Sequence, residues 1–226
     1  NAYGRDTGLE EGFTQLLEMI EEIDGIRWVR FMTSHPRDFS LAAIKRIAKL
    51  GKVCEQYHLP VQSGSNHVLE LMKRGYSREK YLALVDAVRE HVSNACLSTD
   101  IICGFPGESE NDFNDTLELV KKVRYESAFM YYYSPRPGTE AAKMTEQLSE
   151  EEKKDRLARL IEVQNRISLE ESRNLIGHDY EVLVESAAAR HDDLVGKTRS
   201  GRSVNFPGDK SLIGSYVRVR IEQARN

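Results

Sequence analysis

The most constraining feature of the sequence is residues 99–108, TDIICGFPGE, which read as a strand, a tight turn and the approach to a helix. Residues 101–103 form a short apolar run without a helical flank, which is typical of a strand covered on both faces. The two glycines predict a turn, and Ser109 with Asp112 three residues later predicts a helix N-terminus. In a parallel α/β unit of this kind, ligands bind just beyond the carboxyl end of the strand. We therefore expect the functional site near residues 100–108.

Size, charge and cysteine content limit the class of protein. The chain has 226 residues, which is enough for one large domain and one small domain. Its net charge of -4 gives no overall attraction to nucleic acid, so any such binding must be local. The apolar runs are far shorter than a membrane span, so we expect no membrane partner. The cysteines are odd in number and widely spaced (Cys54, Cys96 and Cys103), which indicates a reducing, cytoplasmic setting.

Helical and strand patterns alternate through the first part of the chain, which predicts a parallel sheet with crossover helices. The expected helices span residues 9–24, 40–50, 66–73, 77–91 and 109–124, and the expected strands span residues 26–32, 53–61, 95–103 and 128–133. Each strand ends in a polar cluster, and in a barrel these ends share the rim where active sites form. This favours an enzyme. Four strands cannot close a barrel, so we expect further strands before Asn1 in a parent protein.

The second part of the chain changes from a long helix to short β runs. Residues 149–152 predict a capping box for a helix that reaches residue 175, with a buried stripe of Leu157, Leu160, Ile161 and Ile167. After Gly177 the pattern predicts a small OB-like β-barrel. The predicted domains are residues 1–148, a connecting helix at 149–176, and the barrel at 177–226.

A basic turn at residues 197–202 precedes Phe206 in the expected small barrel. Basic and aromatic side chains together suit phosphate contacts and stacking on a base. A solvated hairpin is the alternative, and the segment alone favours that alternative.

The residues that carry chemistry do not form a familiar nucleotide or hydrolase motif. His35 and His58 lie near strand ends, which leaves a metallohydrolase barrel open, although no second ligand lies at metal spacing and single hydrogen-bonding roles are favoured. Cys96 and Cys103 do not resemble an iron–sulfur ligand set, and buried apolar cysteines are the favoured interpretation. We predict no metal ligands in this chain.

Polar residues after the strands are the candidate ligand contacts. Gln62, Ser63 and Ser65 suit a polar ligand, while an N-cap role is the alternative for Ser65. Arg136 lies between two prolines and suggests an anionic or planar partner, with a structural salt bridge as the alternative. From the residues alone, the interpretation is a parallel α/β enzyme with an appended β-barrel, and nucleic acid is one candidate substrate.

A family resemblance makes this interpretation specific. Five motifs occur in the order TSHP, HLPVQSGS, MKRGYS, TDIICGFPGE and YSPRPGT, and the chain closes with VNFPG and IGSYVRVRIEQA. The set resembles the radical S-adenosylmethionine methylthiotransferases, and the closing segment resembles their TRAM domain. Within the family, TSHP and VQSGS are similar to the branch that acts on tRNA, the MiaB type. The implied fold is the C-terminal part of a (β/α)6 partial TIM barrel followed by a small all-β TRAM barrel.

The resemblance also implies a reaction and its cofactors. In this family a 4Fe-4S cluster cleaves S-adenosylmethionine to a 5′-deoxyadenosyl radical, and a second 4Fe-4S cluster supplies sulfur. A methylthio group then replaces the hydrogen on carbon 2 of an isopentenylated adenosine next to the tRNA anticodon. The implied partner is therefore the anticodon stem-loop of tRNA, and we expect a monomer.

Site residues follow from the resemblance motif by motif. The S-adenosylmethionine contacts correspond to Gln62, Ser63, Ile102 and Gly104, with Asp100 at the rim or in support. The substrate side corresponds to Ser34, His35 and Arg136. The TRAM positions suited to RNA contact are Lys197, Arg199, Arg202 and Phe206.

The chain departs from the family in one respect: the CxxxCxxC loop and the N-terminal cysteine domain are not in the sequence. The resemblance places both before Asn1, so we expect this chain to be an inactive part of an active enzyme, with no catalytic residue of its own. Two alternatives stay open. One is methylthiolation of threonylcarbamoyladenosine in tRNA, and the other is a non-catalytic RNA-binding module.

Overall fold

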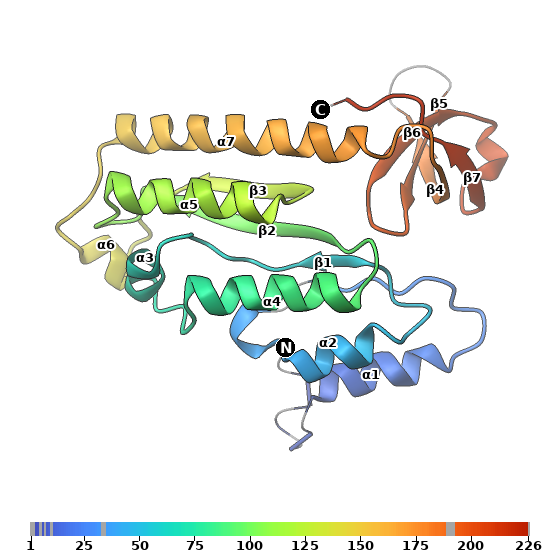
Figure 1. Cartoon of the computed structure of the whole chain (residues 1–226), viewed down its shortest axis with the longest axis horizontal. Coiled ribbons are helices and arrows are strands. Elements are labelled where there is room, and N and C mark those ends of the chain that lie inside the picture. The colour runs from blue at the N-terminus through green and yellow to red at the C-terminus, as the bar shows by residue number, and fades with distance from the viewer. Residues whose placement is uncertain are drawn as a thin grey trace.

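The computed structural model describes residues 3–4, 6, 8–9, 11–32, 35–188 and 193–225 of the chain. Figure 1 shows helices stacked around a small parallel sheet, with an antiparallel sheet at one end. The helices are α1 (Gly12–Glu21), α2 (Leu41–Ile47), α3 (Asn66–Leu71), α4 (Arg78–His91), α5 (Glu110–Val123), α6 (Glu140–Lys143) and α7 (Glu150–Arg173), with 3-10 turns η2 (Pro36–Asp38) and η3 (Lys210–Leu212). The strands are β1 (Gln56–His58), β2 (Cys96–Cys103), β3 (Ser127–Tyr132), β4 (Asp179–Ala187), β5 (Asp193–Thr198), β6 (Ser203–Pro207) and β7 (Tyr216–Arg220).

The first sheet is parallel, as the alternating pattern predicted. Its order is β1-β2-β3, with β1 and β3 both paired to β2. One face packs against the helices, and its core includes the fully buried Tyr57, Leu97 and Ile101. Because the strands are parallel, all their carboxyl ends lie along one edge of the sheet, where the candidate ligand loops begin.

The prediction of a strand at residues 26–32 was wrong. Val29 forms a single parallel bridge with Val53, and no ladder continues from it within the described residues. The side chains on either side of Val29 contact the C-terminal sheet. The Arg30 guanidinium donates to the Thr198 carbonyl at 2.8 Å, and Trp28 stacks edge-on against Tyr216. The predicted strand at 53–61 is correspondingly reduced to the three residues of β1.

Two capping boxes confirm the predicted helix starts. The Ser109 hydroxyl accepts from the backbone of Asp112 while the Asp112 side chain accepts from Ser109, and α5 begins there. Ser149 and Glu152 make the same reciprocal pair at the start of α7. Each box satisfies backbone N–H groups that a helix leaves without partners.

Helix α7 lies against β3, β2 and α5. Leu160 and Ile167 are buried as predicted, and Leu157 packs against the same core. Ile161 is exposed, so its place in the predicted stripe was wrong. The polar residues Lys153, Arg156 and Gln164 are buried on this helix instead.

The C-terminal sheet is antiparallel with the order β6-β5-β4-β7. A register shift between Val184 and Ser186 bends β4, which gives a curled sheet of the small, barrel-like kind predicted. In Figure 1 this sheet lies beyond the end of α7, and helices α3 and α6 lie at the opposite end. Among the described residues, no helix combines the length and apolarity that crossing a bilayer requires.

Candidate functional site

The loops after β1 and β2 meet at the carboxyl edge of the parallel sheet. Gln62 and Ile101 form a parallel bridge beyond the end of β1. The Gln62 N–H donates to the Asp100 carbonyl, and the Ile102 N–H donates to the Gln62 carbonyl, both at 2.9 Å. The sequence-predicted residues Gln62 and Ile102 are therefore adjacent, and both are partly exposed. Such an edge is where ligands bind in parallel α/β proteins.

Gln62 holds a backbone conformation that is unfavourable for its residue type. Its φ is 69°, in the left-handed region, although it carries a full side chain. This conformation costs about 1–2 kcal/mol relative to the right-handed region. Backbone strain of this kind gathers at ligand sites, where the surrounding structure holds it in place. Glu11, Lys73, Asn94 and Arg124 also have a positive φ, but these four lie next to helices, whereas Gln62 lies at the carboxyl edge of the parallel sheet.

Ser63 and Gly104 support the edge from beneath the surface. The Ser63 side chain is fully buried and its hydroxyl lies 3.3 Å from that of Thr116. Gly104 is also buried, and a Cβ added there would lie 2.6 Å from Cγ of Lys153. Its φ of 69° and the close approach of α7 both call for glycine. In the structure, the direct partners of these two residues are protein groups.

Asp112 fastens the loop after β1 to the start of α5. Its carboxylate accepts from the hydroxyls of Ser65 and Ser109, and the Nδ1 of His67 lies 3.2 Å away. Burial raises the pKa of Asp112, but these hydrogen bonds outweigh it and lower the pKa to about 2. Asp112 is thus ionised at neutral pH and holds the candidate loop in place.

His35 and Arg136 lie on loops near the same edge, and Ser34 lies outside the described residues. The His35 ring stands edge-on to Tyr76, whose hydroxyl donates to the Val61 carbonyl at 2.9 Å. Burial, Arg74 and Arg37 lower the pKa of His35, so the ring is neutral at pH 7. Arg136 is exposed in the loop after β3, and within the part of the chain that the structure describes it makes no ion pair.

The face of the parallel sheet that carries Ser98 and Asp100, which we call the inner face, holds a polar and aromatic cluster. The sequence analysis named His58 and Asp100 but missed Ser98, Phe129 and Tyr131. The buried His58 ring lies 2.9 Å from the Ser98 hydroxyl through Nδ1 and 3.4 Å from the Asp100 carboxylate through Nε2. Phe129 pairs with Asp100 in the strand register, and Phe129 and Tyr131 are each 53% exposed. The alternation of aromatic residues along β3 was the available signal, because alternate residues of a strand share a face.

A buried ion pair holds the glycine turn against α7. The Arg156 guanidinium donates to the Glu108 carboxylate at 2.6 Å, and the Gly104 N–H donates to the same oxygen at 2.7 Å. Burial raises the pKa of Glu108, while the Gly104 and Arg156 hydrogen bonds act against that rise. This pair fixes the turn that follows β2.

The cysteines are buried and unpaired, as the sequence predicted. Burial raises the pKa of Cys96 and of Cys103 to about 12, and burial also raises the pKa of Cys54. Metal ligation requires the thiolate form, which these surroundings disfavour. Among the described residues, no three His, Cys, Asp or Glu side chains are placed to share a metal ion. The donor set present therefore does not fit an iron–sulfur cluster.

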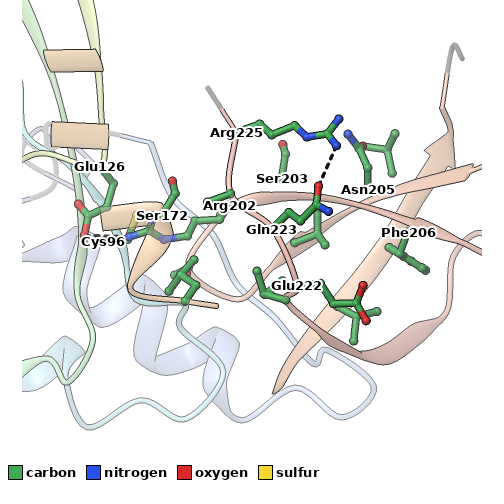
Figure 2. A pocket seen from close by; sticks show the side chains of 18 of the residues that line it. Cys96, Glu126, Ser172, Arg202, Ser203, Asn205, Phe206, Glu222, Gln223 and Arg225 are labelled. Carbon is green, nitrogen blue, oxygen red and sulfur yellow. Dashed lines mark hydrogen bonds and ion pairs between the residues drawn. The ribbon is translucent and has the colours of Figure 1, made fainter. Parts of the chain in front are cut away.

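The sequence-predicted RNA residues lie at the other end of the sheet from Gln62. Arg199 donates to Glu55 and Arg202 pairs with Glu126, and these carboxylates precede β1 and β3. Lys197 lies 3.9 Å from Glu185 within the C-terminal sheet. Phe206 lines a cleft of about 1410 Å³ between the two sheets, and Figure 2 shows it there with Arg202 and Glu126. The cleft and the Gln62 edge are thus separate places.

Comparison with known proteins identifies the two parts of the chain. The model of the radical SAM superfamily matches residues 2–120, and the model of the TRAM domain matches residues 173–226. The structure is similar to that of coproporphyrinogen III oxidase from Escherichia coli, a radical SAM enzyme, with a TM-score of 0.58. That similarity covers 96% of this chain and 52% of the other chain at 16% sequence identity, so it supports the fold alone.

Curated relatives match the whole chain. The tRNA-2-methylthio-N(6)-dimethylallyladenosine synthase of Moorella thermoacetica is 51% identical over 226 residues, which are 100% of this chain and 51% of the relative. The enzymes of the same name from Pelotomaculum thermopropionicum and Desulforamulus reducens are 48% and 50% identical, with 50% and 49% of their lengths covered. The chain thus spans about half the length of these relatives. With its TRAM domain and its partial β/α barrel, the chain belongs to the radical SAM superfamily.

Proposed function

We propose that this chain works as part of a radical SAM enzyme that adds a methylthio group to carbon 2 of isopentenylated adenosine in tRNA. The observation that carries this proposal is about 50% identity, over the entire chain, to three enzymes named for that product. The TRAM match and the strained ligand edge at Gln62 agree with it. The proposed setting is the reducing cytoplasm, which suits three free, buried cysteines.

For the cofactor, we propose that Gln62 and Ile102 contact S-adenosylmethionine directly. Both are partly exposed at the carboxyl edge, and the Gln62 strain indicates a backbone shaped for a ligand. We propose supporting roles for Ser63 and Gly104, because both are buried beneath that edge. Bound S-adenosylmethionine would supply one-electron chemistry that removes a hydrogen atom from the substrate. Two 4Fe-4S clusters, held by residues outside this chain, complete the proposal.

For the substrate, we propose that the inner face of the sheet receives the modified adenosine. Phe129 and Tyr131 offer exposed rings to a flat base and an apolar isopentenyl group. Arg136 offers a cation at the same edge, which suits an RNA phosphate. His35 is neutral there, so it can accept as well as donate a hydrogen bond. We extend this assignment to Ser34 on the basis of the sequence alone.

For the RNA partner, we propose that the anticodon stem-loop contacts the TRAM domain through Lys197 and Phe206, and that the enzyme is a monomer. Lys197 keeps 42% of its side chain exposed. Phe206 lies in the wall of the cleft between the two sheets, where an aromatic ring can stack on a base. Arg199 and Arg202 have partners within the protein, so their contribution to RNA binding would require those contacts to open.

The test is an anaerobic assay of the full-length enzyme with isopentenylated tRNA and S-adenosylmethionine that carries a deuterated methyl group. We expect the deuterated methylthio group on the isopentenylated adenosine in a nucleoside digest. Tyr131→Ala lowers the yield, while exchange of the exposed Lys122 on α5 for Gln leaves it unchanged. Modification of threonylcarbamoyladenosine instead, or tRNA binding without any turnover, would refute the proposal.

A further inference from the structure

Hydrogen bonds inside the turn between β5 and β6 fix its backbone conformation. We call residues 198–202 the docking turn. Thr198 is buried, and its hydroxyl accepts from the Arg202 N–H at 3.1 Å. The Gly201 N–H donates to the Thr198 carbonyl at 2.9 Å, and Gly201 has a φ of 82° that suits glycine. The turn therefore presents its remaining side chains, chiefly that of Arg199, from a defined backbone.

Arg199 donates hydrogen bonds from Nε and Nη2 to the radical SAM half of the chain. Its Nε donates to both carboxylate oxygens of Glu55, at 2.7 and 3.0 Å. Its Nη2 donates to the carbonyls of Gly51 and Val53, each at 2.6 Å. The planar fork of an arginine suits this arrangement, because several donors in fixed directions meet acceptors on one loop. A side chain with these partners is a poor candidate for a phosphate contact.

Gly201 and Arg202 of the docking turn also contact the radical SAM half of the chain. A Cβ on Gly201 would lie 2.3 Å from the side-chain oxygen of Gln56, so the turn is in close contact with the start of β1. The Arg202 guanidinium lies 3.5 Å from the carboxylate of Glu126, just before β3. Figure 2 shows Arg202 directed toward Glu126 at the edge of the cleft. One turn thus bridges the amino-terminal ends of two parallel strands.

A second set of contacts joins the two sheets beside the turn. Arg30 donates to the Thr198 carbonyl at 2.8 Å and lies 3.6 Å from Glu185. Trp28 stacks edge-on against Tyr216, with ring centroids 4.8 Å apart. Polar and aromatic contacts therefore act together to fix the orientation of the C-terminal sheet.

We infer that Arg199 is a positioning residue that locks the TRAM domain onto the amino-terminal end of the barrel sheet through Glu55. The inference rests on the proposed function, and it assigns to Arg199 a structural partner instead of RNA. The carboxyl edge with Gln62 lies at the other end of β2, whose eight residues span roughly 23 Å at ~3.3 Å per residue. The lock thereby sets the distance between RNA held on the TRAM domain and the reacting edge.

Two substitutions distinguish this lock from a phosphate contact. Arg199→Gln removes the cation, and Glu55→Gln removes its partner but leaves the cation in place. If Arg199 is a lock, both variants of the full-length enzyme loosen the TRAM domain, and Arg199→Gln does so more because it also loses the contacts with the Gly51 and Val53 carbonyls. If Arg199 binds a phosphate, only Arg199→Gln weakens tRNA binding, and Glu55→Gln leaves it unchanged or strengthens it.

The first measurement is the distance between spin labels carried by unnatural amino acids at Lys122 on α5 and at Ser211 in the TRAM domain. Both positions are exposed. We expect Arg199→Gln and Glu55→Gln to broaden the distance distribution, Arg199→Lys to broaden it less, and the control Lys210→Gln to leave it narrow. A distribution that stays narrow in both Arg199→Gln and Glu55→Gln would overturn the lock.

The second measurement is tRNA binding and turnover at several salt concentrations. We expect kcat/KM for tRNA to fall about tenfold in both variants, while the slope of log binding constant against log salt stays that of the parent. A slope reduced by about 0.7–0.9 in Arg199→Gln alone would mean one lost phosphate contact and would refute the lock. If the parent enzyme modifies no tRNA, the proposed function fails, whereas the label distances still decide the lock.

Discussion

The hydroxyl of Ser65 donates to the carboxylate of Asp112, and this contact ties the loop after β1 to the first turn of α5. The same carboxylate closes the capping box with Ser109. One partly buried anion therefore organises both a helix start and the loop that carries Gln62.

Asp112→Asn should reduce stability in a pH-dependent way. Hydrogen bonds lower the pKa of Asp112 to about 2 from a usual 3.8, so the ionised form stabilises the fold by roughly 2 kcal/mol at neutral pH. Because the folded-state pKa lies below the unfolded one, this stability is present above about pH 4 and is lost as pH falls through about 2. Urea unfolding of the parent and Asp112→Asn at several pH values checks this. A stability difference that stays constant from pH 7 to pH 2 would contradict it.

Gln62→Gly should separate folding from ligand binding. Glycine tolerates the φ of 69°, so the free energy of unfolding should be about 1 kcal/mol higher for this variant than for Gln62→Ala. Urea unfolding measures this difference. Both variants lose the side chain that we assign to S-adenosylmethionine. In the full-length enzyme, titration calorimetry should therefore show weaker S-adenosylmethionine binding in both, by about tenfold. Unchanged affinity in both variants would remove Gln62 from the site.

Arg156→Ala should destabilise the protein by about 3–5 kcal/mol, because it leaves the Glu108 carboxylate buried without its charge partner. Burial already raises the pKa of Glu108, and loss of Arg156 raises it further. A carboxyl whose folded-state pKa is raised is stabilised by protonation, so the variant should gain stability as pH falls from 7 toward 5. Thermal unfolding across that range measures the effect. The double variant Glu108→Gln/Arg156→Ala should lack this pH dependence.

Tyr131→Ala should affect catalysis more than folding. The ring is 53% exposed, so truncation should change the free energy of unfolding by less than about 1 kcal/mol. If the inner face receives the modified base, kcat/KM for tRNA should fall by at least tenfold. Tyr180→Ala on β4 is the matched control, because it removes a partly buried tyrosine from the other sheet. Equal loss of activity in the two variants would argue against a role for the inner face.

Local signals predicted the elements that depend on local contacts. The capping boxes at Ser109 and Ser149 were readable because both partners lie within one helical turn. The parallel direction of β1, β2 and β3 followed from the alternation of helices and strands. The rim was predictable for the same reason, because the carboxyl ends of parallel strands must share an edge.

The sequence pattern did not predict which side chains are buried or paired where the partner lies far away in the chain. Arg156 reads as a solvent-facing helix residue, yet Glu108, 48 residues away, draws it into the core. Ile161 fits an apolar stripe in the sequence, but the stripe that packs on the sheet contains Gln164 instead, which donates to the Tyr125 carbonyl. Arg199 reads as an RNA contact until the structure places Glu55 against it. No spacing in the sequence encodes these three contacts.

The most direct test of the central claim is the nucleoside content of tRNA from cells that lack the full-length enzyme, with and without a plasmid that restores it. The account predicts that 2-methylthio-isopentenyladenosine disappears, that isopentenyladenosine accumulates, and that the plasmid reverses both changes. Loss of the methylthio form of threonylcarbamoyladenosine instead, with 2-methylthio-isopentenyladenosine unchanged, would contradict it.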